Sequence, residues 1–129
     1  MAGAKVLIVD DHPVNLKLAR IVLATAGYDV ATAVDAESAL AVLGTWSPAL
    51  ILMDLQLPGV DGYELTRRIK ADPARAGTAV VALTAYAMKG DEERARAAGC
   101  DGYITKPVDA ARLLEQVAAF VAAGPAGRS

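Results

Sequence analysis

The sequence predicts a doubly wound α/β domain, in which a parallel sheet lies between two layers of helices. Short, continuous apolar runs alternate five times with stretches of helical spacing. The connections between them are short, which favours parallel strands joined by right-handed crossovers. Polar residues follow four of the five runs, at the ends of strands where such sheets bind ligands. The expected fold is therefore a three-layer (βα)5 sandwich, with a five-stranded sheet of order 2-1-3-4-5.

The five apolar runs are the expected strands. A strand that is buried on both faces of a parallel sheet reads as a continuous apolar run, rich in Val and Ile. The runs are Val6–Val9, Tyr28–Thr32, Ala49–Met53, Ala79–Leu83 and Gly102–Thr105, of which the second and the last are weaker. Polar, Gly or Pro residues bound them and predict where each strand ends.

Five amphipathic stretches are the expected helices. The first carries an apolar face made of Val14, Leu18, Ile21, Val22 and Thr25, and Gly27 stands where a C-terminal cap belongs. The other helices are expected at Ala36–Leu43, Gly62–Lys70, Asp91–Ala98 and Asp109–Ala122. Asp61 is the expected N-cap of the third helix, and Gly99 closes the fourth.

The last three helices differ in how they are anchored. Leu65 and Ile69 anchor the third, and the fifth carries a stripe of Leu113, Val117, Phe120 and Val121. The fourth offers only Ala95 and Ala98. A buried alanine contributes far less than a leucine, at about 25 cal/mol per Å² of apolar area. We therefore expect the fourth helix to be the most easily displaced.

Length and composition predict one domain with a substantial core. The chain has 129 residues, 54% hydrophobic and 22% charged, which excludes disordered and fibrous proteins. We expect the domain to span residues 1–123 and residues 124–129 to form a frayed tail. The net charge is −2, whereas domains that bind nucleic acids are usually strongly basic, so this class is not expected. With no signal peptide and no apolar run near the ~20 residues of a membrane span, a cytoplasmic location without membrane contact is expected.

Only one cysteine, Cys100, and one histidine, His12, are present. They cannot form a disulfide or a Cys/His zinc cluster, and they leave almost nothing from which to build a nucleophilic pair. A single histidine beside two acids at a helix start is most simply an exposed polar residue. Cys100 is expected to pack as a small hydrophobic side chain.

Four of the predicted strands deliver a polar group to one edge of the sheet. They end in Asp10-Asp11, in Asp54, in Thr84 and in Thr105-Lys106. Three carboxylates at one site repel one another unless a counter-charge is present. A hard divalent cation supplies that charge, and oxygen ligands select Mg²⁺, Mn²⁺ or Ca²⁺ over zinc. A metal, an ammonium and a hydroxyl around one carboxylate suit phosphoryl transfer to that carboxylate.

The same residues lie in segments that resemble the receiver domain of two-component response regulators. The segments are KVLIVDDHPVN, LILMDLQLPGVDG, VVALTAYAMKGDE and GCDGYITKPVD. The resemblance covers almost the whole chain, and it is closest to single-domain receivers of the DivK type and to receiver modules of hybrid histidine kinases. It implies the receiver, flavodoxin-like fold and a role in a phosphorelay.

The resemblance also implies roles for individual residues. Asp54 resembles the phosphoacceptor, which forms an aspartyl-phosphate. Asp11, Asp54 and the backbone carbonyl of Gln56 resemble the ligands of Mg²⁺, with Mn²⁺ as a substitute, and Asp10 assists directly or through water. No further cofactor is implied.

Three more positions match the switch machinery of the family. Thr84 resembles the hydroxyl that bonds a phosphoryl oxygen, Lys106 the lysine that pairs with the phosphoryl group, and Tyr103 the aromatic switch residue. Ala85 fits the small residue that follows the threonine. The implied partners are a histidine kinase or histidine phosphotransfer protein, and a downstream protein that contacts the fourth helix, fifth strand and fifth helix.

Two alternatives belong to other functional classes. A small Mg-dependent phosphatase of the haloacid dehalogenase kind also forms an aspartyl-phosphate, but it needs a carboxylate two residues after the nucleophile, where this chain has Gln56. A flavodoxin-like cofactor carrier needs a Ser/Thr/Gly-rich phosphate loop after the first strand, where this chain has acids. The preferred hypothesis is a signalling switch that catalyses only its own phosphotransfer and autodephosphorylation.

Overall fold

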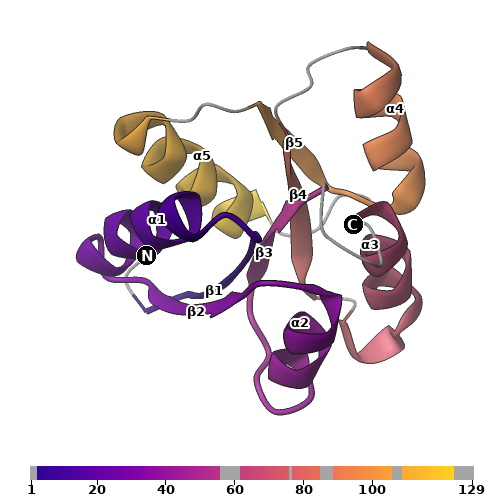
Figure 1. Ribbon diagram of the computed structural model, residues 1–129, viewed down its shortest axis with the longest axis horizontal. Helices are drawn as coiled ribbons and strands as arrows, with labels where there is room; N and C mark the ends of the chain where they lie inside the picture. The colour runs from indigo at the N-terminus through magenta and orange to yellow at the C-terminus, as the bar shows by residue number, and fades with distance from the viewer. Residues whose placement is uncertain (1–2, 56–61, 76, 85–88, 106–108, 124–129) are drawn as a thin grey trace.

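Figure 1 shows the computed structural model, which describes residues 3–55, 62–75, 77–84, 89–105 and 109–123. The strands are β1 (Lys5–Val9), β2 (Asp29–Ala33), β3 (Leu50–Asp54), β4 (Ala79–Thr84) and β5 (Gly102–Thr105). The helices are α1 (Pro13–Thr25), α2 (Ala36–Leu43), α3 (Gly62–Ala71), α4 (Lys89–Ala98) and α5 (Ala110–Ala123). A short 3₁₀ helix, Pro73–Arg75, follows α3 and was not expected from the sequence.

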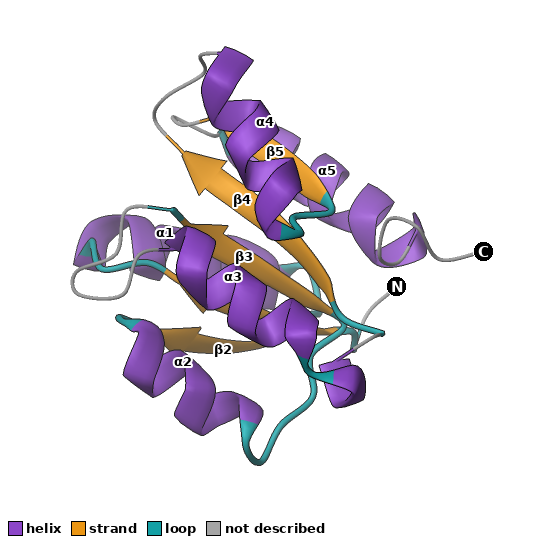
Figure 2. Ribbon diagram, turned by 90° about the vertical axis from the view of Figure 1, so that its right-hand side faces the viewer, coloured by secondary structure: helices purple, strands orange, loops and turns teal. Residues whose placement is uncertain are grey.

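The strands form one parallel sheet in the order β2-β1-β3-β4-β5. α1 and α5 cover one face of this sheet, and α2, α3 and α4 cover the other (Figure 1). The second group of helices lies in front of the sheet in Figure 2. The predicted three-layer class and strand order are both confirmed.

Each face of the sheet has its own hydrophobic cluster. Alternate residues of β1 belong to opposite clusters, with Leu7 and Val9 on the side of α2, α3 and α4, and Val6 and Ile8 on the side of α1 and α5. Every residue of β3 is buried. Burial on both faces is the reason why these strands read as continuous apolar runs.

The face of α1 that was expected to be buried is only partly buried. Val14, Leu18 and Ile21 are 78%, 56% and 45% exposed. The helix instead buries Leu23 and packs a second row, Leu16, Ala19 and Val22, against the sheet. Two apolar rows of α1 both have helical spacing, so periodicity alone does not decide which row faces the core.

Helix ends agree with the predicted signals where the structure describes them. Gly27 and Gly99 have φ values of +99° and +109°, the left-handed conformation that favours glycine after a helix. Boundaries differ by one or two residues from those expected, and Ala36–Leu43 is confirmed without change. The predicted cap Asp61 and the predicted tail 124–129 lie outside the described residues.

Within the described part of the chain, no helix has the length and apolar character that crossing a bilayer requires.

Candidate functional site

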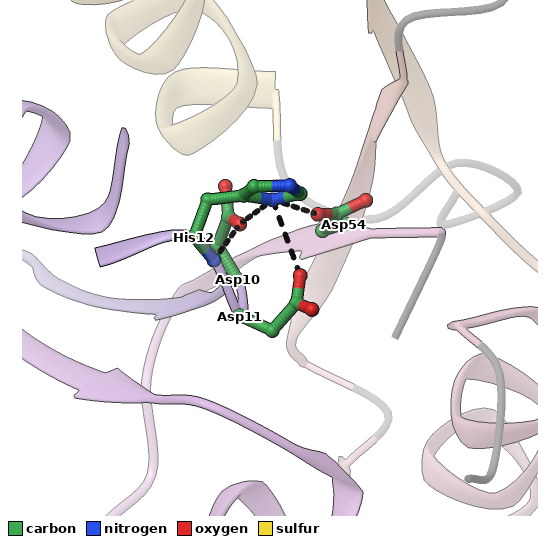
Figure 3. A group of neighbouring side chains, drawn as sticks. All are labelled: Asp10, Asp11, His12 and Asp54. Atoms are coloured by element: carbon green, nitrogen blue, oxygen red, sulfur yellow. Dashed lines mark hydrogen bonds and ion pairs between the residues drawn. The ribbon is translucent and has the colours of Figure 1, made fainter. Parts of the chain in front are cut away.

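The carboxyl ends of β1 and β3 bring three acids and one histidine together. Asp10, Asp11 and His12 follow β1, and Asp54 is the last residue of β3. Each offers one potential ligand atom, and these four atoms all lie within 4.8 Å of one another (Figure 3). The register explains the approach, because β1 and β3 are paired neighbours that run in the same direction, with Val9 opposite Met53.

The backbone around this cluster is held by hydrogen bonds. The Asp10 N–H donates to the Ala33 carbonyl at 3.0 Å, which ties the end of β1 to β2. One Asp10 oxygen, Oδ1, accepts from the His12 N–H at 2.9 Å. His12 is the N-cap residue of α1, and Pro13 occupies the first turn, where its missing N–H costs nothing. The acid pair is therefore placed between a sheet edge and a helix start.

The backbone after Asp54 is packed against α3. The Leu55 N–H donates to the Leu83 carbonyl at 3.2 Å, and the Gly62 N–H donates to the Leu55 carbonyl at 3.2 Å. A Cβ atom on Gly62 would lie 2.5 Å from Leu55 Cα and 2.6 Å from the Asp54 carbonyl oxygen. Only glycine lets the start of α3 come this close to the end of β3.

The four side chains of the cluster differ in exposure. Asp10 and Asp54 are buried, whereas the side chains of Asp11 and His12 are 34% and 61% exposed. The site is thus open to solvent on one side and lined by buried carboxylates on the other.

His12 lies closer to the acids than the sequence indicated. Its Nδ1 atom is 3.2 Å from Asp10 Oδ1, 3.2 Å from Asp11 Oδ1 and 3.8 Å from Asp54 Oδ2. The ring is exposed, as expected from the sequence, but it also joins the acidic cluster, which was not expected. Its position directly after the acid pair was the one signal available.

Two of the predicted switch residues lie on the neighbouring strands. Thr84 is buried at the end of β4, one residue after Leu83, which pairs with Asp54. Tyr103 lies on β5 opposite Ala82 and packs partly buried against the cluster on the α4 side of the sheet. The structure therefore brings Asp10, Asp11, Asp54 and Thr84 to one sheet edge. The predicted positions Gln56, Ala85 and Lys106 lie outside the described residues.

The cluster suits a divalent cation. Asp11 Oδ1 is a buried atom that accepts no hydrogen bond from the described residues, and its one contact within the cluster is the ion pair with His12. Clustered carboxylate oxygens are ligands that Mg²⁺ and Mn²⁺ accept, and a bound cation removes the repulsion between them. The donor set is therefore consistent with the metal site expected from the sequence.

Comparison with known proteins identifies the family. The sequence profile of the response regulator receiver domain matches residues 6–118. This chain belongs to the response regulator receiver family. It is 41% identical to the polar-differentiation response regulator DivK of Brucella anthropi over 116 residues. The aligned region covers 90% of this chain and 94% of that relative.

Solved structures agree with this assignment. The chemotaxis response regulator CheY4 of Vibrio cholerae superimposes with a TM-score of 0.87 at 28% identity, covering 92% of this receiver and 98% of that chain. The receiver domain of the sensor histidine kinase PA1611 from Pseudomonas aeruginosa PAO1 has a TM-score of 0.85 at 35% identity, covering 94% and 99%. That structure is described with a magnesium ion coordinated in its active site cleft.

Membership of this family indicates the general function of the chain. The chain is a response regulator receiver domain, and such domains act in two-component phosphorelays as signalling modules. Receivers bind Mg²⁺ at an acidic pocket and interact with histidine kinases and downstream targets. In this receiver Asp10, Asp11 and Asp54, with His12, form an acidic cluster.

Proposed function

We propose that this receiver accepts a phosphoryl group from a phosphohistidine onto Asp54 and signals through protein–protein contacts. The observation that supports this role is the position of Asp54. Its carboxylate is buried at the end of the central strand β3, and it offers an oxygen within 4.8 Å of ligand atoms of Asp10 and Asp11. Asp54 is itself the last residue of its strand, whereas Asp10 and Asp11 follow the end of the neighbouring strand β1.

The proposed metal is Mg²⁺, which Mn²⁺ can replace. Asp11, Asp54 and the backbone carbonyl of Gln56 would hold it, and Asp10 would assist directly or through water. The clustering of one potential ligand atom each from Asp10, Asp11 and Asp54 within 4.8 Å supports this assignment. When bound, the cation neutralises the clustered carboxylates and the charge on phosphoryl oxygens.

The chemistry on the chain's own residues is nucleophilic transfer. A carboxylate oxygen of Asp54 attacks the phosphorus atom, the P–N bond of the donor breaks, and its electron pair stays on the donor imidazole. The ammonium of Lys106 and the hydroxyl of Thr84 stabilise the phosphoryl oxygens. Water later hydrolyses the acyl phosphate, which restores Asp54 and releases inorganic phosphate. The chain thus catalyses only its own phosphotransfer and autodephosphorylation.

The proposed partners follow from this cycle. A histidine kinase or a histidine phosphotransfer protein donates the phosphoryl group. Thr84 and Tyr103 act as the switch, and a downstream protein reads the face formed by α4, β5 and α5. We place the receiver in the cytoplasm, spanning residues 1–123, without nucleic-acid or membrane contacts. DivK-type relatives and the kinase receiver of PA1611 support two settings, a stand-alone response regulator and a module of a hybrid histidine kinase.

A phosphorylation assay tests this function. The protein is incubated with a small-molecule phosphodonor and Mg²⁺, and its intact mass is measured. We expect a gain of one phosphoryl group that hydroxylamine removes, and we expect Asp54→Asn to fold normally without any gain. Asp29→Asn is the matched control, because Asp29 is an exposed acid at the start of β2. Uptake by Asp54→Asn at the wild-type rate would refute the assignment.

A further inference from the structure

The imidazole of His12 reaches into the acidic cluster from the start of α1. Figure 3 shows its Nδ1 atom facing carboxylate oxygens of Asp10, Asp11 and Asp54, at 3.2, 3.2 and 3.8 Å. Its side chain is 61% exposed, so core packing does not hold the ring in this position. It makes no side-chain capping hydrogen bond to α1. The ring is therefore positioned by the carboxylates.

The spacing of these four atoms matches a shared coordination sphere. With metal–ligand bonds of about 2.1 Å, adjacent ligands of an octahedral ion lie about 3.0 Å apart and opposite ligands about 4.2 Å apart. The Nδ1 atom lies 3.2 to 3.8 Å from one oxygen of each acid, and all four atoms lie within 4.8 Å of one another. A single cation can therefore contact the imidazole nitrogen and the carboxylate oxygens with small side-chain adjustments.

A nitrogen ligand changes which metals a site prefers. Carboxylate, carbonyl and water oxygens suit Mg²⁺ and Mn²⁺, whereas imidazole suits later transition metals such as Co²⁺, Ni²⁺ and Zn²⁺. The ligand set implied by the receiver resemblance contains only oxygen atoms. Among the residues of the cluster, His12 would add a nitrogen donor to a set of oxygen ligands.

We infer that His12 is a direct nitrogen ligand of the receiver's metal site and shifts its selectivity from Mg²⁺ toward transition-metal ions. The inference rests on the proposed function, because it requires a cation among Asp10, Asp11 and Asp54. It assigns to His12 a role in choosing the ion, in addition to the acids that bind it. Its consequence is a receiver whose metal loading depends on the supply of transition metals as well as of magnesium.

The test measures coordination and selectivity with Co²⁺ and Mg²⁺ as probes. In the proton NMR spectrum of the Co²⁺-loaded protein, a bound imidazole gives a strongly shifted, exchangeable ring N–H signal. The chain has one histidine, so such a signal belongs to His12. Calorimetry at one fixed pH gives the Kd values of both ions. We expect His12→Ala to lose the signal and to raise the ratio of the Co²⁺ Kd to the Mg²⁺ Kd by about tenfold or more.

Control variants separate the inference from the function on which it rests. Asn15→Ala, an exposed change in the first turn of α1, is expected to keep both the shifted signal and the ratio. Asp11→Ala is expected to weaken the binding of both ions. If Asp11→Ala leaves both affinities unchanged, the proposed metal site itself is wrong. If Asp11→Ala weakens both ions but wild type shows no shifted signal and His12→Ala keeps the ratio, the role of His12 alone is refuted.

Discussion

The acidic residues of the site differ in their exposure to solvent. Asp10 and Asp54 are buried at adjacent strand ends, and Asp11 is partly exposed beside them. The sequence predicted this convergence, because parallel strands end at one edge of a sheet. It did not predict the orientation of His12, since the direction of an exposed ring depends on carboxylates that only the fold assembles.

Removal of Asp11 is expected to have opposite effects with and without metal. Asp11→Ala should weaken Mg²⁺ binding, because it removes a proposed ligand. In the metal-free protein it should raise the unfolding temperature, because one of three repelling carboxylates is gone. Wild type should gain thermal stability from Mg²⁺ by linkage, and the variant should gain less. Thermal unfolding with and without Mg²⁺ measures both effects, and unchanged Mg²⁺ stabilisation of Asp11→Ala would place the site elsewhere.

We expect the buried thiol of Cys100 to make the protein less stable at alkaline pH. Burial raises the pKa of its thiol to about 11, from an ordinary value of 9.0. The unfolded chain therefore releases the thiol proton first, and stability present below pH 9.0 is lost as pH rises through about 11. A shift of about two units corresponds to about 2–3 kcal/mol. Urea denaturation of wild type and Cys100→Ala across this range measures the difference, and equal slopes in the two proteins would contradict it.

At the scale of elements, α3 and α4 are held in different ways. α3 buries Leu65 and Ile69, as expected, and starts at Gly62 against the backbone of β3. α4 buries Ala95 and Ala98. As expected, its described part buries no large apolar side chain.

A cation–π contact also links the two helices. The Arg94 guanidinium of α4 lies 4.1 Å from the centre of the Tyr63 ring of α3. The sequence offered no spacing rule for this contact, because it joins residues of two helices whose relative placement depends on the fold. Such a contact adds only about 0.5–1 kcal/mol at an exposed site. It therefore leaves α4 weakly held.

Gly62→Ala is expected to destabilise the protein by about 1–3 kcal/mol, the usual cost of overpacking. The added Cβ would meet backbone atoms of Asp54 and Leu55, which cannot rotate away. Gly90→Ala is the matched control, because a Cβ there meets nothing within 4 Å, and alanine stabilises a helix by about 0.5–1 kcal/mol relative to glycine. Urea midpoints of the two variants should move in opposite directions; a neutral Gly62→Ala would show that the contact is adaptable.

Phosphorylation is expected to change amide exchange mainly in residues 84–103. This segment joins Thr84, beside the proposed acceptor, to the weakly anchored α4 and to Tyr103. A local charge next to a weakly held element is the arrangement that a population switch needs. Thr84→Ala should accept phosphate yet transmit little of this change. Hydrogen exchange with and without a phosphodonor measures it, and changes confined to α1 and α2 would refute the mechanism.

For the whole molecule, patterning predicted the architecture and left details of packing open. Continuous apolar runs identified the five strands because both faces of this sheet are buried. The two apolar rows of α1 could not be ranked, since the choice depends on how the helix is turned toward the sheet. The 3₁₀ helix at Pro73–Arg75 was missed because three residues carry too little periodicity to be recognised.

Whether Asp54 carries the phosphoryl group can be measured by chemical mapping of the modified residue. The protein is treated with a small-molecule phosphodonor and Mg²⁺, reduced with borohydride, digested and sequenced by mass spectrometry. Borohydride reduces an aspartyl-phosphate to homoserine, so the modified position retains a permanent label. We expect homoserine at position 54 and unmodified aspartate at positions 10, 11 and 29. Homoserine at another aspartate, with position 54 unmodified, would contradict it.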